Sequence, residues 1–424
     1  MIRFLFKGLI RDKSRSRLPI IVVAIGVMLS VLMHAYVTGI MGDTIEMSAK
    51  FSTGHLKVMT KAYAADVDQM PNDLALTGVN QMIDKLRSDY PGVDWTPRIR
   101  FGGLIDVPDE KGETRGQAPV MGMAIDLLSK SSPDAKRLNL KNSLVRGKLP
   151  HISGEVLLSE LLSQKLNVNP GEKITLISST MNEGLAIYNF VVSGTVRFGT
   201  TALDRGTIIA DLHDVQMALD MQDAAGEILG FFKTGYYDDQ KAATDLARFN
   251  AGYANDKDEF APVMLRLRDQ ESMAMFVDLA KNMGALVTLV FMIAMSIVLW
   301  NAGLLGGLRR YGEIGVRLAI GEEKGHVYRS MIYEAVMIGI AGTVTGTALG
   351  LFFAWLIQTW GINIATFTKG ASVMMPEVIR ARITTPDFFI GFIPGVISTL
   401  IGTMLAGIGI YKRKIAQLFK ELEA

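Results

Sequence analysis

The run LPIIVVAIGVMLSVLMHAYVTGIM, residues 18–41, decides the fold class of this chain. It contains no charged side chain, and as a helix it would be about 36 Å long, enough to cross the ~30 Å hydrocarbon core of a membrane. Three later runs pass the same test of length and composition, at residues 283–308, 331–357 and 388–411. The spacing predicts four membrane-spanning α-helices, one near the N-terminus and three in the C-terminal third, with a large insertion after the first.

The composition also favours an integral membrane protein. Of 424 residues, 49% are hydrophobic and only 20% are charged, so a soluble enzyme is a poor expectation. The formal net charge of +2 is too small to indicate binding of nucleic acid. Because the chain has no cysteine, it has no disulfide, no thiolate metal site and no cysteine nucleophile. A large domain outside the cytoplasm must therefore be stable through its core alone.

Basic residues beside the apolar runs predict the orientation. Lys and Arg side chains crowd residues 3–17, whereas Asp43 and Glu46 follow the first run, which places the N-terminus in the cytoplasm. A cleaved signal peptide is the competing interpretation, but its apolar core is usually about 7–15 residues long and ends in an A-x-A-like site, which this run lacks. The predicted layout is a cytoplasmic segment 1–17, span 18–41, periplasmic domain 42–282, span 283–308, cytoplasmic coupling loop 309–328, span 329–357, periplasmic loop 358–386, span 387–411 and cytoplasmic tail 412–424.

The insertion has the composition of a globular α+β domain. Its two flanks each combine strand and helix patterns, with strands at 55–60, 99–107 and 262–268 and helices at 77–90 and 239–249. Between the flanks, a β-rich insert is expected from short strand-like runs at 156–158, 173–177, 190–196 and 207–210, with a turn at Asn169-Pro170-Gly171. Residues 178–188 indicate a hairpin with an exposed tip, a possible site for a periplasmic partner, at Met181, Asn182, Glu183 and Gly184.

Motifs for catalysis, cofactors and metals are missing from the sequence. The five histidines have no metal-ligand spacing, and no G-x-S-x-G, H-E-x-x-H or G-x-x-x-x-G-K-[ST] motif occurs. We therefore expect no catalytic, cofactor or metal site in this chain, and any work it performs needs energy from a partner protein or an ion gradient. An ion-coupled carrier is disfavoured, because the polar residues of the spans, His34, Asn301 and Glu334, lie near the span ends.

Glycines recur at four-residue spacing in two of the spans. Gly342, Gly346 and Gly350 line one face of the third span, and Gly391 and Gly395 repeat the pattern in the fourth. Such rows allow close approach of another helix. The neighbour is either a second subunit, which would make a dimer, or another helix of the same chain.

The loop between the second and third spans, LRRYGEIGVRLAIGEEKG at residues 308–325, is amphipathic. Its composition suits a helix on the inner membrane surface or a docking helix for a cytoplasmic partner. The loop also carries an R-x-x-E-I-x-x-x-x-A-x-G run, at Arg310, Glu313, Ile314, Ala319 and Gly321. With Glu334 and the glycines that follow it, this run resembles the signature region of the MacB/FtsX-like ABC transporter permeases.

Within that family, the outer domain resembles the lipoprotein-releasing LolC/LolE type. Similar runs stand at residues 54–58, 97–99, 147–149, 154–158 and 170–172. The resemblance implies a porter-like subdomain from flanks 54–105 and 206–268 and a sabre-like insert at 106–205. The hairpin at 178–188 departs from that type, because it is short and has no proline where a carrier-recruiting permease has a Pro-rich extension.

The resemblance implies a non-catalytic permease subunit in the bacterial inner membrane, paired with an identical or paralogous subunit. ATP and Mg would be bound by a cytoplasmic ABC ATPase dimer that pushes on the loop at Arg309, Arg310, Glu313, Ile314, Arg317, Leu318 and Gly321. The motion would reach the periplasmic domain and extract lipoproteins from membrane lipid, with or without a periplasmic carrier. The alternatives are MacB-like efflux of a peptide, antibiotic or other amphiphile through an adaptor, and FtsX-like regulation of an envelope enzyme.

Overall fold

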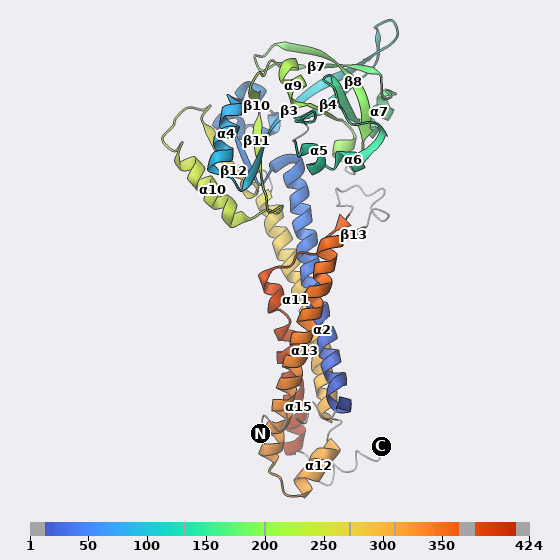
Figure 1. Cartoon of the computed structure of the whole chain (residues 1–424), viewed down its shortest axis with the longest axis vertical. Coiled ribbons are helices and arrows are strands. Elements are labelled where there is room, and N and C mark those ends of the chain that lie inside the picture. Colours follow the sequence, from blue (N-terminus) through green and yellow to red (C-terminus); the bar gives the residue numbers. More distant parts are fainter. Residues whose placement is uncertain are drawn as a thin grey trace. The chain divides into compact units, whose positions relative to one another are not determined.

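The computed structural model describes residues 13–129, 132–198, 201–270, 273–308, 311–363 and 378–412. The chain forms two compact units. We call them the helical unit, residues 1–43, 278–364 and 378–424, and the β-rich unit, residues 44–277 and 365–377. Figure 1 shows the elements of both units.

The helical unit is built from long apolar helices that run side by side (Figure 1). In the described residues, four helical segments are long and apolar enough to cross a membrane, at 17–53, 273–305, 324–360 and 385–408. This confirms the predicted number and order of spans. The elements are α2 (Lys13–Ser48), α11 (Met273–Leu308), α12 (Tyr311–Ala319), α13 (Lys324–Trp360), β13 (Ile362–Asn363), β14 (Val378–Ile379), η5 (Thr385–Phe388), η6 (Ile393–Ser398) and α15 (Thr399–Lys412).

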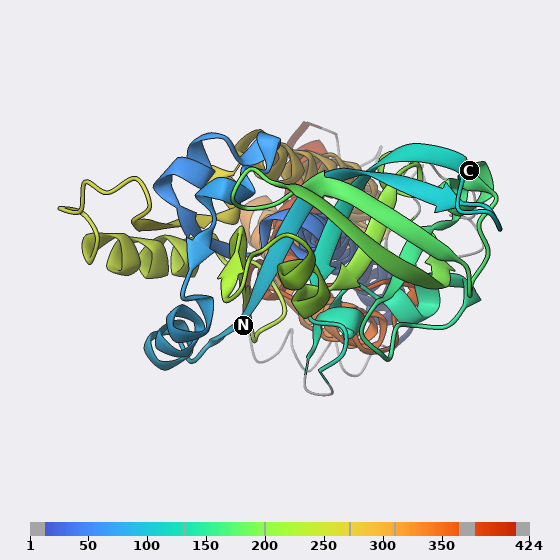
Figure 2. The same cartoon turned by 90° about the horizontal axis from the view of Figure 1, so that it is seen from above.

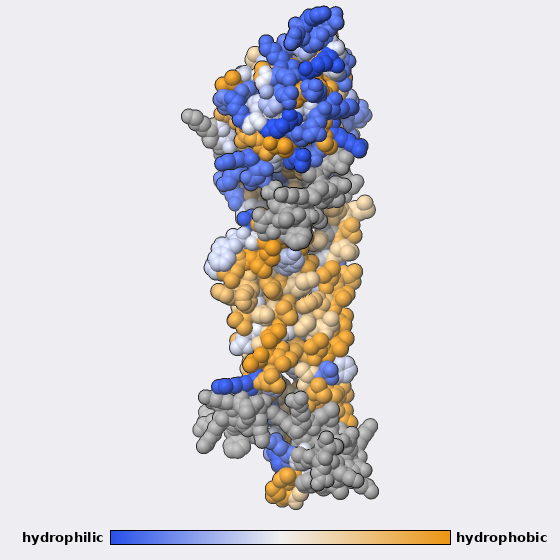
Figure 3. All heavy atoms as spheres, turned by 90° about the vertical axis from the view of Figure 1, so that its right-hand side faces the viewer, coloured by the Kyte–Doolittle hydropathy of each residue, from blue (hydrophilic) through white to orange (hydrophobic). Residues whose placement is uncertain are grey.

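The surface of the helical unit suits contact with lipid. Figure 3 shows a continuous apolar surface over its helices, whereas the β-rich unit is mostly hydrophilic on the same face. The interior is held by close packing, with Val23, Val27 and Val31 of α2 buried against Leu299 of α11. In lipid such packing, rather than exclusion of water, holds helices together.

The β-rich unit contains one large sheet, with strand order β12-β1-β11-β3-β4-β9-β6-β8-β5 and with β7 paired to both β3 and β8. Its strands are β1 (Leu56–Thr60), β3 (Val93–Pro108), β4 (Thr114–Ile125), β5 (Leu144–Gly147), β6 (Glu155–Ser159), β7 (Lys173–Ser179), β8 (Leu185–Val196), β9 (Thr207–Asp211), β11 (Glu227–Phe232) and β12 (Pro262–Arg266). A separate pair is formed by β2 (Leu76–Thr77) and β10 (Ala224–Ala225).

Helices cover this sheet at both ends. Figure 2 shows α4 and α10 at one end and the long strands β7 and β8 crossing the other. The helices are η1 (Ala49–Thr53), α3 (Lys61–Ala65), η2 (Val67–Gln69), η3 (Asn72–Leu74), α4 (Val79–Asp89), α5 (Asp134–Arg137), α6 (Leu140–Ser143), α7 (Glu160–Leu166), α8 (Thr201–Asp204), α9 (Leu212–Ala218), α10 (Asp239–Ala251) and η4 (Leu267–Asp269). The main core lies between sheet and helices and includes Leu56, Ile99, Phe101 and Leu176.

The long strand β3 belongs to both halves of the sheet. Its residues 93–98 pair with β11, and residues 99–108 pair with β4. The half formed by β12, β1, β11 and the start of β3 corresponds to the predicted flanks. The other half differs from the predicted insert at 106–205, because β9 (Thr207–Asp211) pairs with β4 and β6 of the insert. The insert sheet therefore begins at residue 99, inside β3, because no turn interrupts this strand where its partner changes from β11 to β4. It extends to residue 211 because β9 belongs to it.

Candidate functional site

The predicted coupling loop contains a short helix, α12, that turns back onto α13. Gly321 ends the turn with a φ of +102°, a left-handed conformation that favours glycine. Ile314 and Leu318 of α12 are buried against Val327 and Met331 of α13. These two α12 side chains were predicted to contact an ATPase. The structure instead uses them to fix α12 to α13, since apolar residues four apart share one face of a helix.

The opposite face of α12 is exposed. Glu313 and Val316 of α12 and Ile320, the first residue after α12, follow each other at spacings of three and four residues, and all three are exposed. Ile320 is 82% exposed and Val316 is 45% exposed. We call these three residues the α12 ridge. Exposed apolar side chains on a short helix suit contact either with the membrane surface or with a protein partner.

Arg317 and Glu322 stabilise the turn after α12. Nε and Nη2 of Arg317 each donate to a carboxylate oxygen of Glu322 at 2.7 Å, which is a bidentate pair. The hydrogen bonds from Arg317 hold the pKa of Glu322 below its ordinary value, although burial acts in the other direction. Arg317 therefore stabilises the turn after α12. In the sequence it directly follows Val316, a residue of the α12 ridge. The predicted contacts Arg309 and Arg310 lie outside the described residues.

The two predicted glycine rows pack inside the helical unit. A Cβ on Gly342 would lie 2.6 Å from Cβ of Val23, and one on Gly346 would lie 2.5 Å from the carbonyl oxygen of Ala24. Gly350 faces Val31 of α2 in the same way. The third-span row therefore lets α13 lie directly against α2, which corresponds to packing within one chain.

The second row meets the same helix from another side. A Cβ on Gly391 would lie 2.5 Å from Cγ1 of Val27 of α2. One on Gly395 would lie 2.1 Å from Oγ1 of Thr343 of α13 and 2.7 Å from Cγ2 of Val27. Val27 is completely buried. Both rows thus pack against α2, and the second row also packs against α13, so a second subunit would need a different surface.

The predicted hairpin tip lies between β7 and β8 and is bonded to the rest of the β-rich unit. The backbone N–H of Met181 donates to the carbonyl oxygen of Leu219, and Nδ2 of Asn182 donates to a carboxylate oxygen of Asp220 at 2.7 Å. Glu183 has a φ of +59°, and the amide of Gly184 bonds back within the turn. The tip is therefore an anchored turn rather than a projecting arm.

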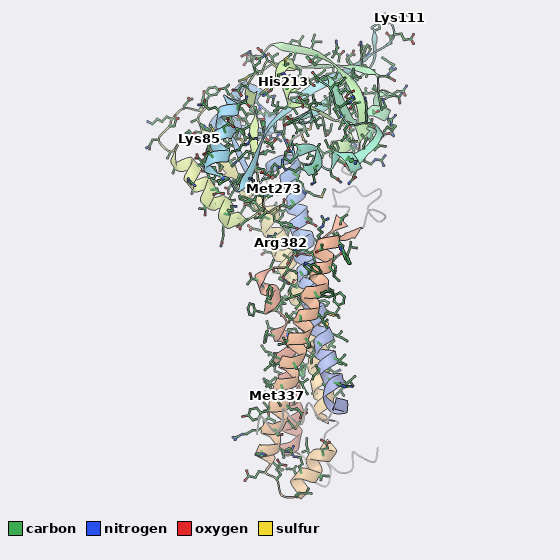
Figure 4. The ribbon with its side chains drawn as sticks, in the orientation of Figure 1. Lys85, Lys111, His213, Met273, Met337 and Arg382 are labelled. Carbon is green, nitrogen blue, oxygen red and sulfur yellow. The ribbon has the colours of Figure 1, made fainter. Side chains whose placement is uncertain are left out.

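A different hairpin projects from the β-rich unit. Lys111 lies at the tip between β3 and β4, at the far end of two long strands (Figure 4). The carboxylate of Asp109 accepts hydrogen bonds from the amides of Lys111 and Glu113, which closes the turn. This hairpin was not predicted from the sequence, because the pattern of its second strand, β4, did not indicate a strand.

Comparisons with known proteins find similarity to membrane permeases. The FtsX-like permease C-terminal family matches residues 285–415, which includes α12 and α13. The macrolide export ATP-binding/permease protein MacB of Bradyrhizobium diazoefficiens is 28% identical over 114 residues, covering 26% of this chain and 16% of that protein. The lipoprotein-releasing system transmembrane protein LolC of Xylella fastidiosa is 25% identical over 258 residues, covering 58% of each chain.

Two solved structures share low similarity with the chain. The periplasmic region of MacB from Actinobacillus actinomycetemcomitans is 14% identical, with a TM-score of 0.34 over 52% of this chain and 91% of that one. A domain of a putative permease from Porphyromonas gingivalis is 9% identical, with a TM-score of 0.32 over 53% of this chain and 97% of that one. The chain spans 16% of the length of the MacB relative and 58% of the length of the LolC relative. With its four apolar helices and its FtsX-like permease domain at residues 285–415, it is similar to permeases of the MacB, FtsX and LolC type.

Proposed function

We propose that this permease is driven by a separate cytoplasmic ABC ATPase dimer and transmits the motion through the inner membrane to a periplasmic β-rich unit. The α12 ridge carries this proposal. It presents Glu313 and Val316 on α12, and Ile320 directly after it, while the other face of α12 is packed on α13. A push on the ridge is therefore delivered to a span rather than absorbed by a flexible loop. In this scheme both termini and α12 are cytoplasmic, as the basic residues indicate.

The sequence of this chain has no G-x-x-x-x-G-K-[ST] phosphate-binding motif. ATP and Mg would therefore be bound by the partner ATPase. An ABC ATPase acts as a dimer, and two ATPase subunits need two permease subunits. The partner permease is then a second copy of this chain or a paralogue. Because both glycine rows face α2 of the same chain, the second subunit would contact other surfaces of the helical unit.

As cargo we propose lipoproteins, taken from the outer leaflet of the inner membrane. The similarity to LolC supports this, since it extends over 58% of each chain. Extraction of an acyl chain costs about 0.8 kcal/mol for each CH₂ removed from lipid, so it requires an external source of energy. The anchored turn at Met181–Gly184 offers no projecting arm, so a soluble carrier would have to dock elsewhere.

Efflux of an amphiphile is the second candidate, and the similarity to the MacB permease over 114 residues favours it. The two functions differ in their partners. A lipoprotein-releasing permease binds acylated proteins, whereas an efflux permease binds a periplasmic adaptor.

The test is purification of the tagged full-length chain in mild detergent, from cells fed labelled palmitate, followed by identification of every bound protein. We expect an ABC ATPase together with palmitate-labelled protein. An ATPase with an unacylated adaptor would replace lipoprotein release by efflux. Preparations that contain the permease without any ATPase would contradict the proposed function altogether.

A further inference from the structure

Two apolar helices of the helical unit, α2 and α11, share a small pocket. It is lined by Ser30, Met33 and His34 of α2 and by Thr288, Phe291 and Met292 of α11. On each helix these residues have the spacing i, i+3, i+4, so they lie on one face. The pocket therefore brings two thioethers, one imidazole and two hydroxyl groups together inside an otherwise apolar part of the molecule.

A buried carboxylate orients the imidazole in this pocket. Nδ1 of His34 lies 2.7 Å from Oδ1 of Asp387. The other carboxylate oxygen of Asp387 accepts from the backbone amide and the hydroxyl of Thr384, at 2.6 and 2.8 Å. Because an ionised carboxylate only accepts hydrogen bonds, the ring proton of neutral His34 is assigned to Nδ1. The lone pair of Nε2 is then left for another contact.

This arrangement is the one that metal-binding histidines use. Such a histidine almost always donates its second ring N–H to a carboxylate or a carbonyl group, which fixes the tautomer and the direction of the ring. A His–Asp pair between two spans also serves packing alone, so the pair by itself does not indicate a metal. The two methionines that line the same pocket, Met33 and Met292, make the difference.

The ligand types select one class of metal. Thioether sulfur is a soft ligand that prefers Cu(I), whereas Zn²⁺, Mg²⁺ and Ca²⁺ prefer thiolate, imidazole or oxygen ligands. In the part of the chain that the structure describes, no three His, Cys, Asp or Glu side chains come together as a metal site. The sequence predicted no metal site because its histidines lack ligand spacing and it has no cysteine, and that reasoning did not count methionine.

The charge of the site also favours a monovalent ion. The side chain of Asp387 is completely buried and that of His34 is 17% exposed. While His34 is neutral, the carboxylate is a single negative charge in a place where charge is costly. One monovalent cation at Nε2 balances that charge, and a divalent cation would leave an excess. If the imidazole is protonated, binding of the metal releases that proton.

The size of the pocket excludes larger occupants. Its non-atom space of about 180 Å³ is divided too finely to admit a water molecule, so an acyl chain or a detergent does not fit. A metal ion needs less room, because coordination bonds bring its ligands closer than van der Waals contact. The flexible side chains of methionine can adjust around it.

We propose that this pocket binds Cu(I) through Sδ of Met33, Sδ of Met292 and Nε2 of His34, with Asp387 as a positioning residue that orients the imidazole. Two ligands come from α2 and one from α11, so the bound ion joins these helices within the helical unit. The inference goes beyond the proposed function and does not depend on it, since it needs neither an ATPase nor a cargo.

The test is titration of the full-length chain, purified in detergent with a tag that contains no histidine. Cu(I) is supplied as its bicinchoninate complex without oxygen, and transfer to the protein is followed by the loss of colour. The chain has no cysteine, so thiolate binding cannot contribute. We expect one Cu(I) per chain, and no comparable binding of Zn²⁺.

The decisive variant is Met33→Leu/Met292→Leu, because leucine keeps the size and apolar character of methionine but has no sulfur. The affinity for Cu(I) should fall at least about tenfold. Met337→Leu, on α13 outside the pocket (Figure 4), is the matched control and should bind as the wild type does. The melting temperatures without metal should agree among the three chains. Should the double variant fail to fold, Met292→Leu alone replaces it.

X-ray absorption at the copper edge separates the roles of the residues. The wild type should show sulfur and nitrogen neighbours of copper, and the methionine variants should lose the sulfur signal. Asp387→Asn should weaken binding about 10- to 100-fold while the copper that still binds keeps its sulfur neighbours, as expected for a positioning residue.

Three results would overturn the inference. The first is a wild-type chain that takes no Cu(I) from bicinchoninate. The second is equal affinity in the methionine variants and in Met337→Leu. The third is a copper shell of nitrogen and oxygen only, or Zn²⁺ bound as tightly as Cu(I), because either result would assign binding to histidine without methionine.

Discussion

Replacing Ile320 by serine tests whether the α12 ridge docks the ATPase. Ile320 is 82% exposed in the lone chain, so nearly all of its apolar surface is available to a partner. Full burial of such a side chain contributes about 1.5–3 kcal/mol, and each 1.4 kcal/mol is a factor of ten, so the Kd for the ATPase should rise about 10- to 100-fold. The free energy of unfolding should change by no more than about 0.5 kcal/mol, as for other surface substitutions.

The assay compares the amount of ATPase that co-purifies with the tagged chain, together with the melting temperature of the purified permease. Ile187→Ser is the matched control, because Ile187 is 63% exposed but lies on β8 of the β-rich unit. Wild-type recovery of ATPase with Ile320→Ser would refute docking at the ridge. Ile314→Ala should instead lower the free energy of unfolding by about 2–5 kcal/mol, measured as a lower melting temperature, because Ile314 is buried against α13.

Further predictions concern packing, charge and backbone conformation. Gly346→Val should destabilise the helical unit by about 1–3 kcal/mol in thermal unfolding, because a Cβ there lies 2.5 Å from a carbonyl oxygen of α2; an unchanged melting temperature would contradict that packing. Arg317 lowers the pKa of Glu322, so their pair stabilises the α12 turn above the ordinary carboxyl pKa and is lost as the pH falls through the lowered one. Glu322→Gln should abolish that pH dependence in hydrogen exchange of α12, an effect of at most about 1 kcal/mol for an exposed pair; exchange that stays pH-dependent would count against it. Gly54→Ala should destabilise the β-rich unit by about 1–3 kcal/mol in thermal unfolding, because Gly54 has a φ of +62° and a backbone oxygen 2.6 Å from an added Cβ. Gly78→Ala, at a φ of +66° in open space, should cost less, and equal losses would contradict the steric argument.

The sequence predicted the spans and many strands because these depend on local patterns. Long apolar runs specify membrane helices through their length, and short alternating runs gave strands such as β1 and β7. The strand β4 was missed because Gly116, Pro119 and Gly122 interrupt its pattern. The structure explains one of them: the ring of Phe101 occupies the space that a Cβ of Gly122 would need. Such a cross-strand contact has no signature in a single segment.

The candidate site was predicted only in part, for a similar reason. Ile314 and Leu318 form one apolar row of α12, and Val316 and Ile320 form another at the same spacing. Periodicity alone does not show which of these two rows packs on α13. The residues predicted to contact the ATPase, Ile314 and Leu318, belong to the row that the structure buries.

Hydrolysis of ATP by purified material tests the central claim most directly. The permease alone, stripped of bound proteins, should not hydrolyse ATP, whereas the complex recovered in mild detergent should hydrolyse it in a vanadate-sensitive way. The activity recovered with Val316→Ser/Ile320→Ser should fall in proportion to the ATPase lost from the preparation. Hydrolysis by the isolated chain, or a functional assembly that contains no ATPase, would contradict the account.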